Sequence, residues 1–488
     1  MSDNELGNPA NTGRRKRGAL AAFAFTARSL QQISTLVITL LAARFLLPAE
    51  YGVYSLGVVF VTLIQTMTYT GFYHHIVTSK DDETALLSTS FWMICGLASG
   101  AAVLLAAAAG PIAWAFDAPE LHAVLIWLAA AQPFAGASAW FSAVLLRHEK
   151  MTTHFTIMFI QNLLALVLGV ILLGLWQSLY ALVAFRYVRV FSGLLLYLVG
   201  TRTRPGLQFN RTIARTATNF SGGLYGSRFL TFLSRYAGDL ILGITFSTAE
   251  AGLYRFGNRI ATGAIDIIAQ PMRSFALTQI AAKGRRGDPL GPAAERFIGG
   301  TVLLTGGVAA VIVVFAEHIV ATLFNPAYLA AAVVTYAMAV RGVVAIGPMI
   351  LEPVLATQDR TGQIMRFNLI WAVITVISVV LAAPYGLGVL AWSQAGVTAA
   401  STLWAIRLMQ REANVGVAGT LRAMCVAGAV VGGYGCVLGF SWPVIAGFVN
   451  LGAPATLAVG LGWAVLLSLP TLGVGRAVKV FSLRIFSK

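Results

Sequence analysis

Ten arginines interrupt the long apolar stretches of this 488-residue chain. An arginine near the centre of a bilayer costs about 2.5–3.5 kcal/mol on the insertion scale, so each one needs a partner, water or a function. A guanidinium can hold a phosphate through two parallel hydrogen bonds, so a group of such residues suits an anion, particularly a phosphate or diphosphate. The ten are Arg28, Arg44, Arg186, Arg189, Arg228, Arg235, Arg255, Arg259, Arg273 and Arg341.

One group of charged residues follows a helical repeat between residues 251 and 281. Arg255, Arg259, Asp266 and Arg273 are separated by 4, 7 and 7 residues. These steps return to the same side of a helix, so the spacing predicts one charged face.

Two smaller groups share this kind of spacing. Arg228, Arg235 and Asp239 follow steps of 7 and 4 residues, and we expect Arg235 and Asp239 to pair because they are one helical turn apart. Arg186 and Arg189, three residues apart, also share a face.

Acidic residues are scarce in the apolar stretches. Of 18 Asp and Glu, only Asp239, Asp266 and Glu352 lie there. The arginines therefore predict an electropositive, water-filled cavity, although single residues could instead bond helix-end carbonyls or interhelical acids. The candidate substrate-binding residues are Arg28, Arg228, Arg235, Arg255, Arg259, Arg273, Arg186 and Arg189. The candidates for coupling to a proton or sodium ion are Asp239 and Asp266.

The sequence predicts that these residues lie on membrane-spanning helices. The chain is 58% hydrophobic and 11% charged, whereas about a quarter of the residues in soluble domains are charged. With about 20 apolar residues per crossing, and with spans ended at charge clusters and Pro or Gly turns, the sequence predicts an all-α polytopic membrane protein with about 14 transmembrane helices. The predicted spans lie near 19–47, 51–77, 86–110, 121–146, 153–175, 179–200, 219–246, 251–281, 297–316, 328–356, 363–383, 387–409, 418–440 and 444–472.

Lysine and arginine indicate the orientation of these spans. Cytoplasmic loops collect these residues, and with the amino terminus inside, 24 of the 34 fall in or beside cytoplasmic segments. Both termini are then cytoplasmic. The net charge of +16 is thus chiefly an orientation signal and gives no reason to expect nucleic-acid binding.

A six-residue phrase occurs twice, as "AEYGVY" from Ala49 and as "AEAGLY" from Ala249. An offset of 200 residues also pairs Arg28 with Arg228, and gives ten identities in 35 positions. Such self-similarity predicts two copies of one folding unit. Because six crossings separate them, the copies point the same way, as in parallel-repeat transporters. We expect the phrase itself to be structural, its glycines allowing close packing at the outer turn.

The resulting organisation has six parts. Two pseudo-symmetric six-helix lobes are followed by two C-terminal helices and a basic amphipathic tail attracted to anionic lipid. The parts are a cytoplasmic N-terminal tail (1–18), the N-lobe (19–200), a basic cytoplasmic linker (201–218), the C-lobe (219–410), the extra helices (411–472) and the C-terminal tail (473–488).

Signals for other chemistry are missing from the sequence. It contains neither the G-x-x-x-x-G-K-[ST] phosphate loop nor the H-E-x-x-H zinc motif. Its three cysteines, Cys95, Cys425 and Cys436, lie in apolar stretches without metal-ligand spacing. We therefore expect no catalytic residue, metal or cofactor, and a protein that is not an enzyme.

The stretches "ARFLLPAEYGVYSL" and "STAEAGLYRFGNRI", with spans divided six, six and two, resemble the Wzx-type polysaccharide flippases of the multidrug/oligosaccharidyl-lipid/polysaccharide (MOP) exporter superfamily. The resemblance implies a MATE-like fold, a central cavity lined by spans 1, 2, 7 and 8, and the bacterial inner membrane. It also implies a substrate, an undecaprenyl-diphosphate-linked oligosaccharide for exopolysaccharide, lipopolysaccharide or capsule biosynthesis. The expected partners are this lipid-linked oligosaccharide, membrane lipids and a polysaccharide polymerase or export complex; the protein itself is expected to be monomeric.

Three alternatives stay open at this point. A MATE-type multidrug or cation antiporter would need cavity acids, which the first six spans lack. A flippase for the peptidoglycan lipid precursor would share both the fold and the anionic lipid. A membrane polysaccharide polymerase would normally carry catalytic residues on a sizeable outer loop, whereas the outer loops here are short.

Overall fold

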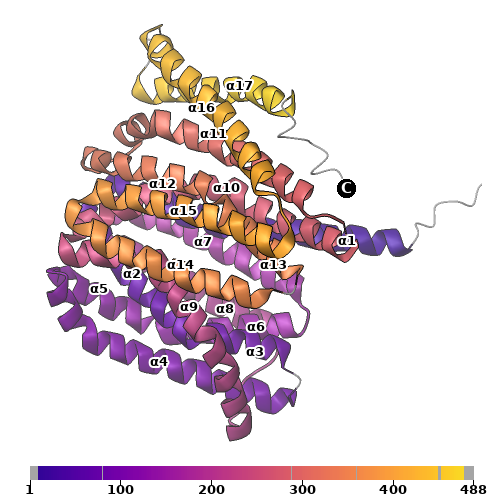
Figure 1. The fold of residues 1–488 in the computed structure, drawn as a ribbon. Helices are drawn as coiled ribbons and strands as arrows, with labels where there is room; N and C mark the ends of the chain where they lie inside the picture. Colours follow the sequence, from indigo (N-terminus) through magenta and orange to yellow (C-terminus); the bar gives the residue numbers. More distant parts are fainter. Residues whose placement is uncertain (1–8, 80, 287, 359, 449–451, 478–488) are drawn as a thin grey trace, which may run out of the picture. The chain divides into compact units, whose positions relative to one another are not determined.

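The computed structural model describes residues 9–79, 81–286, 288–358, 360–448 and 452–477, and all regular secondary structure in these ranges is helical (Figure 1). Some side chains within the helices, including that of Arg28, fall outside the description. The prediction of an all-α protein is confirmed.

Contacts along the chain divide it into two compact units. Unit 1 comprises Met1–Leu46 and Val53–Phe232, and unit 2 comprises Leu47–Gly52 and Leu233–Lys488. The boundary falls inside a helix, 14 residues beyond the predicted start of the C-lobe at residue 219.

Unit 1 contains the helices from the start of the described chain to the first part of α9. They are α1 (Pro9–Phe45), α2 (Pro48–Thr68, of which Pro48–Gly52 belong to unit 2), α3 (Thr70–Thr78), α4 (Glu83–Ala115), α5 (Pro119–Ala130), α6 (Gln132–Arg147), α7 (Met151–Trp176), α8 (Leu179–Gly200) and the first part of α9 (Arg211–Thr245).

Unit 2 contains the rest of α9 and the helices that follow it. They are α10 (Thr248–Arg286), α11 (Gly291–Leu323), η1 (Pro326–Ala331), α12 (Ala332–Val344), α13 (Ile346–Ala356), α14 (Thr361–Ala382), η2 (Ala383–Tyr385), α15 (Leu387–Ala413), α16 (Val417–Phe448) and α17 (Ala453–Ala477).

Ten helices or runs of consecutive helices in the described residues are long and apolar enough to cross a membrane. The four other predicted spans coincide with α1, α9, α10 and α15, which have 37, 35, 39 and 27 residues. At 1.5 Å per residue each exceeds the roughly 30 Å of a bilayer core. Their lower hydropathy follows from the charged and polar residues that they carry, so the number of fourteen stays a prediction.

Three of the predicted spans are divided between two helices. In the second span α2 and α3 meet at Tyr69, and the other two breaks lie in the fourth and tenth spans. The break between α5 and α6 lies at Ala131 and the break between α12 and α13 at Ala345. Pro133 and Pro348 follow these breaks closely. Proline lacks an N–H group and clashes with the carbonyl four residues earlier, which interrupts a helix. The fourth and tenth predicted spans are therefore broken in the same way, as two copies of one unit would be.

At three places a helix extends beyond the predicted span. Residues 9–18 of the predicted tail and 211–218 of the predicted linker are helical, because α1 begins at Pro9 and α9 at Arg211. The last span was expected from residue 444, but α16 continues through Pro443 to Phe448 and α17 begins at Ala453. Apolar membrane helices tolerate a proline, so Pro443 is not a break. The amphipathic tail beyond Ala477 lies outside the described residues.

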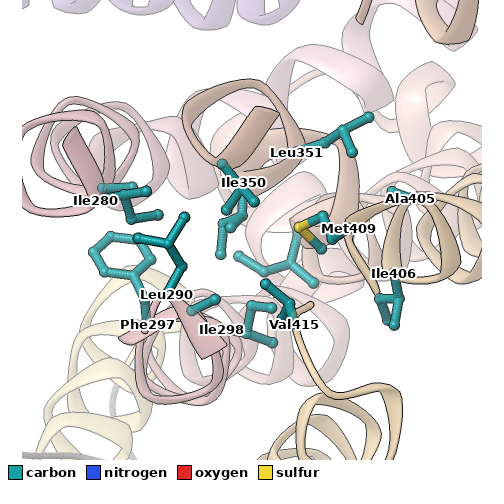
Figure 2. Close-up of a cluster of buried hydrophobic side chains, with 14 of the residues drawn as sticks. Ile280, Leu290, Phe297, Ile298, Ile350, Leu351, Ala405, Ile406, Met409 and Val415 are labelled. Carbon is teal, nitrogen blue, oxygen red and sulfur yellow. The ribbon is translucent and has the colours of Figure 1, made fainter. Parts of the chain in front are cut away.

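Each unit has its own apolar core. In unit 1, Trp140 and Phe141 of α6 are buried with Ile94 of α4 and Phe72 of α3, and the Trp140 indole donates to the carbonyl of Leu87 over 3.0 Å. In unit 2 one core joins α10, α11, α13 and α15 (Figure 2). Its labelled members are Ile280, Leu290, Phe297, Ile298, Ile350, Leu351, Ala405, Ile406, Met409 and Val415.

The two copies of the repeated phrase touch each other within unit 2. A Cβ atom on Gly52 would lie 1.8 Å from the carbonyl oxygen of Thr248, and one on Gly252 would lie 2.1 Å from that of Pro48. Only glycine fits such a close approach of two backbones. The expected structural role of these glycines is confirmed.

Candidate functional site

A buried ion pair joins α9 to α10 in unit 2. The Asp239 side chain is 1% exposed, and its Oδ2 accepts a hydrogen bond from Nη1 of Arg255 over 2.9 Å. The Arg255 guanidinium also lies 5.0 Å from the centre of the Tyr236 ring, a cation–π distance. Oδ1 of Asp239 is buried without a hydrogen-bond partner among the described residues. The guanidinium of Arg255 on α10 is therefore bonded to Asp239 on α9.

The register of this helical hairpin explains the pairing. Asp239 and Arg255 each lie eight residues from Ser247, at the turn between the antiparallel helices α9 and α10. Residues equidistant from such a turn come side by side. The expected pairing of Asp239 with Arg235 is wrong, because the carboxylate finds its partner across the hairpin rather than along its own helix.

A second charged group lies further along the same hairpin. Asp266 interacts electrostatically with Arg235 and Arg259, and Arg259 with Tyr51 as well. Arg235 and Asp266 are exposed, whereas Nε of Arg259 is buried with no hydrogen-bond partner in the described part of the chain. The stripe predicted on α10 thus contains its own countercharge.

The fourth residue of the stripe pairs with another helix. Arg273 forms an ion pair with Glu352 of α13, their side chains being 55% and 51% exposed. The sequence indicated that Glu352 is an acid within a span but gave no partner for it. Exposed pairs of this kind contribute little to stability.

Two more candidate arginines lie on α8 in unit 1. Arg186 and Arg189 are both half-buried there. Among the described residues, the groups that act electrostatically on Arg189 are Arg186, Tyr54 and Tyr69, none of which is a carboxylate. The carbonyl of Arg189 accepts a hydrogen bond from Nε2 of Gln161 over 2.8 Å, which attaches this part of α8 to α7.

Two candidates remain, Arg228 and Arg28. Arg228 is exposed on α9, with Nη2 3.5 Å from Nε2 of His74. Arg28 lies on α1, and its side chain is not among those described, so its role stays a prediction.

Tyrosines are the residues that the sequence interpretation missed. Tyr236 directly follows Arg235, and this adjacency in a charged stripe is a signal that could have been used. Three more tyrosines lie on α2 or directly after it: Tyr51, Tyr54 and Tyr69. The arginines that they interact with are more than a hundred residues away in the chain, so no sequence spacing relates the two groups.

Within the described ranges, no group of three or more His, Cys, Asp or Glu side chains could hold a metal ion. The three cysteines are free.

The fold defines a class of membrane protein. It is similar to the inward closed conformation of the lipid II flippase MurJ, with a TM-score of 0.71 and 11% identity over 94% of this chain and 99% of that one. It is also similar to an inward-facing multidrug resistance MATE family transporter of the MOP superfamily, with a TM-score of 0.60 and 12% identity over 82% and 95% of the chains. The protein is a multi-pass membrane protein with the fold of the MOP superfamily.

The family follows from the sequence comparisons. Residues 41–333, more than half of the chain, match the family model described as "Polysaccharide biosynthesis protein". The chain belongs to this family, as the sequence predicted. It is 25% identical over 224 residues to the succinoglycan biosynthesis transport protein ExoT of Rhizobium meliloti (strain 1021). That match covers 45% of this chain and 44% of the relative, less than half of either.

Proposed function

We propose that the protein is a flippase that moves an undecaprenyl-diphosphate-linked oligosaccharide from the cytoplasmic to the periplasmic leaflet of the bacterial inner membrane. The observation that carries this proposal is membership of the polysaccharide biosynthesis family. The name of the relative ExoT, a transport protein, and the transporter fold support it. The product would be used for exopolysaccharide, lipopolysaccharide or capsule synthesis.

The charge of the membrane helices supports an anionic cargo. Among the ten arginines and three acids in the predicted spans, positive charge is in clear excess. Two negative charges crossing outward move down the membrane potential, because the cell interior is negative. The gain is roughly 4–5 kcal/mol per 100 mV if the whole field is crossed.

Transport would proceed by alternating access, in which the binding groups face one leaflet and then the other. Resetting the empty carrier can use a proton or a sodium ion. Asp239 and Asp266 are the candidate coupling groups; Asp266 is exposed, while Asp239 is already bonded to Arg255. Lipids and a polysaccharide polymerase or export complex are the proposed partners of a monomeric carrier.

Deletion of the gene tests the proposal. We expect surface polysaccharide to be lost and the lipid-linked oligosaccharide to accumulate in the cytoplasmic leaflet, identified by mass spectrometry of extracted lipids. Complementation with the wild-type gene should reverse both effects. Unchanged polysaccharide and no accumulated intermediate would exclude the proposed function.

The same strain separates the alternative functions. Lysis with accumulation of the peptidoglycan lipid precursor would indicate a flippase for that lipid. The similarity of the fold to the lipid II flippase MurJ keeps this alternative open. Increased sensitivity to cationic drugs with normal polysaccharide would indicate an antiporter.

A further inference from the structure

The candidate arginines differ in how far their charge is already neutralised. In unit 2, Asp239 binds Arg255, Glu352 binds Arg273, and Asp266 faces Arg235 and Arg259. An incoming anion would have to compete there with carboxylates that already occupy the guanidinium groups. The charged face that the sequence favours is therefore a poor first contact for a diphosphate.

For the pair on α8, the described residues supply no such countercharge. Arg186 and Arg189 lie three residues apart, so both guanidinium groups leave the same face of the helix. The described groups that interact with Arg189 are a second cation and two tyrosines. Tyr69 in turn interacts with both arginines. Two like charges in a partly desolvated place repel each other and favour a bound anion.

A hydrogen-bond donor of this pair is also unused. Nε of Arg186 is buried and has no partner among the described residues. Leaving a buried charged donor unpaired costs free energy, so such groups mark places where a ligand completes the bonding. In contrast, the exposed Arg44 of α1 in the same unit can reach water.

We propose that Arg186 and Arg189 bind the diphosphate of the polyprenyl carrier, within unit 1. This assignment rests on the proposed function and locates its anion site. Two guanidinium groups match the two negative charges and offer parallel N–H donors to phosphate oxygens. The hydroxyl groups of Tyr54 and Tyr69, which lie within electrostatic range of Arg189, can add donors. The ion pairs of unit 2 then hold helices together rather than hold the cargo.

Binding of a short diphosphate lipid to the purified full chain in detergent tests the assignment. The probe is geranylgeranyl diphosphate, with geranylgeraniol as the uncharged comparison and inorganic pyrophosphate as the lipid-free one. We expect Arg186→Gln/Arg189→Gln to weaken diphosphate binding by about tenfold or more, the range for losing charge-assisted hydrogen bonds. Arg44→Gln/Arg202→Gln removes the same charge from exposed positions of unit 1 and should change affinity less than about twofold.

A second variant guards against simple misfolding. Arg186→Lys/Arg189→Lys keeps the charge but lacks the planar fork, so its affinity should lie between those of the wild type and the glutamine variant. Equal binding by the glutamine variant and the wild type would overturn the assignment, as would a wild type that does not bind the diphosphate probe. Either result would leave the transport proposal standing, because that depends on the lipid that accumulates after deletion.

Discussion

At the scale of residues, one side-chain type meets three environments in this protein. Arg255 is paired with a buried acid, Arg273 with an exposed one, and Arg186 with none that the structure describes. Sequence alone treats the three as equivalent, because each interrupts an apolar stretch. Whether a guanidinium is neutralised by a carboxylate depends on the residues of the neighbouring helices.

The buried pair predicts a stability effect. Asp239→Asn leaves Arg255 charged beside a neutral amide, and we expect a loss of roughly 3 kcal/mol, the lower end for breaking a buried pair because Arg255 keeps 21% exposure. Replacing both residues with leucine should cost less, since no unpaired charge remains. Thermal unfolding of the purified protein in detergent measures both.

The matched control is the exposed pair. Glu352→Gln should shift stability by less than about 1 kcal/mol, because both side chains of the Arg273–Glu352 pair are about half exposed. An Asp239→Asn variant as stable as Glu352→Gln would show that the Asp239–Arg255 pair does not hold α9 to α10.

At the scale of elements, the sequence predicted the helices better than their ends and their pairing. Hydropathy located α4, α7, α8 and α11 because each is a single apolar run. It missed the continuation of α16 past Pro443, since local composition does not distinguish a proline that breaks a helix from one that is tolerated. It also missed the partner of Asp239, because pairing across a hairpin depends on where the turn falls.

The repeated phrase predicts an effect on helix packing. Gly52→Ala or Gly252→Ala would place a methyl group against a backbone carbonyl that has no freedom to move aside. We expect either change to destabilise the protein by about 1–3 kcal/mol, the usual cost of overpacking. The yield of monodisperse protein in detergent and its melting temperature measure the effect.

A glycine with open space gives the comparison. A Cβ on Gly396 of α15 meets nothing within 4 Å in the described structure, and Gly396→Ala should stabilise its helix slightly. Gly52→Ala and Gly396→Ala with equal melting temperatures would mean that the two phrases do not pack as closely as their backbones indicate.

At the scale of the whole molecule, the internal repeat and the distribution of Lys and Arg both bear on how the chain is oriented in the membrane. An offset of 200 residues relates the phrase at Ala49 to that at Ala249, and the broken runs at Ala131 and Ala345 recur in corresponding spans. The six crossings predicted between the copies would keep both in the same orientation. The proposed transport direction depends on this orientation, because the cargo must be taken from the side on which it is made.

The orientation can be tested by finding on which side of the membrane single loops lie. Each span reverses the side, so one miscounted helix would place every later loop on the opposite side. In a variant whose Cys95, Cys425 and Cys436 are replaced by serine, single cysteines report the side of two exposed positions. A membrane-impermeant maleimide applied to intact spheroplasts should label Tyr385→Cys, between predicted spans 11 and 12, and should label Gln208→Cys only after the membrane is opened. This pattern follows from the basic residues that flank Gln208, which the positive-inside rule keeps in the cytoplasm. Labelling of Gln208→Cys in sealed spheroplasts would remove a span from the first six or invert the chain, and the proposed outward direction would fail with it.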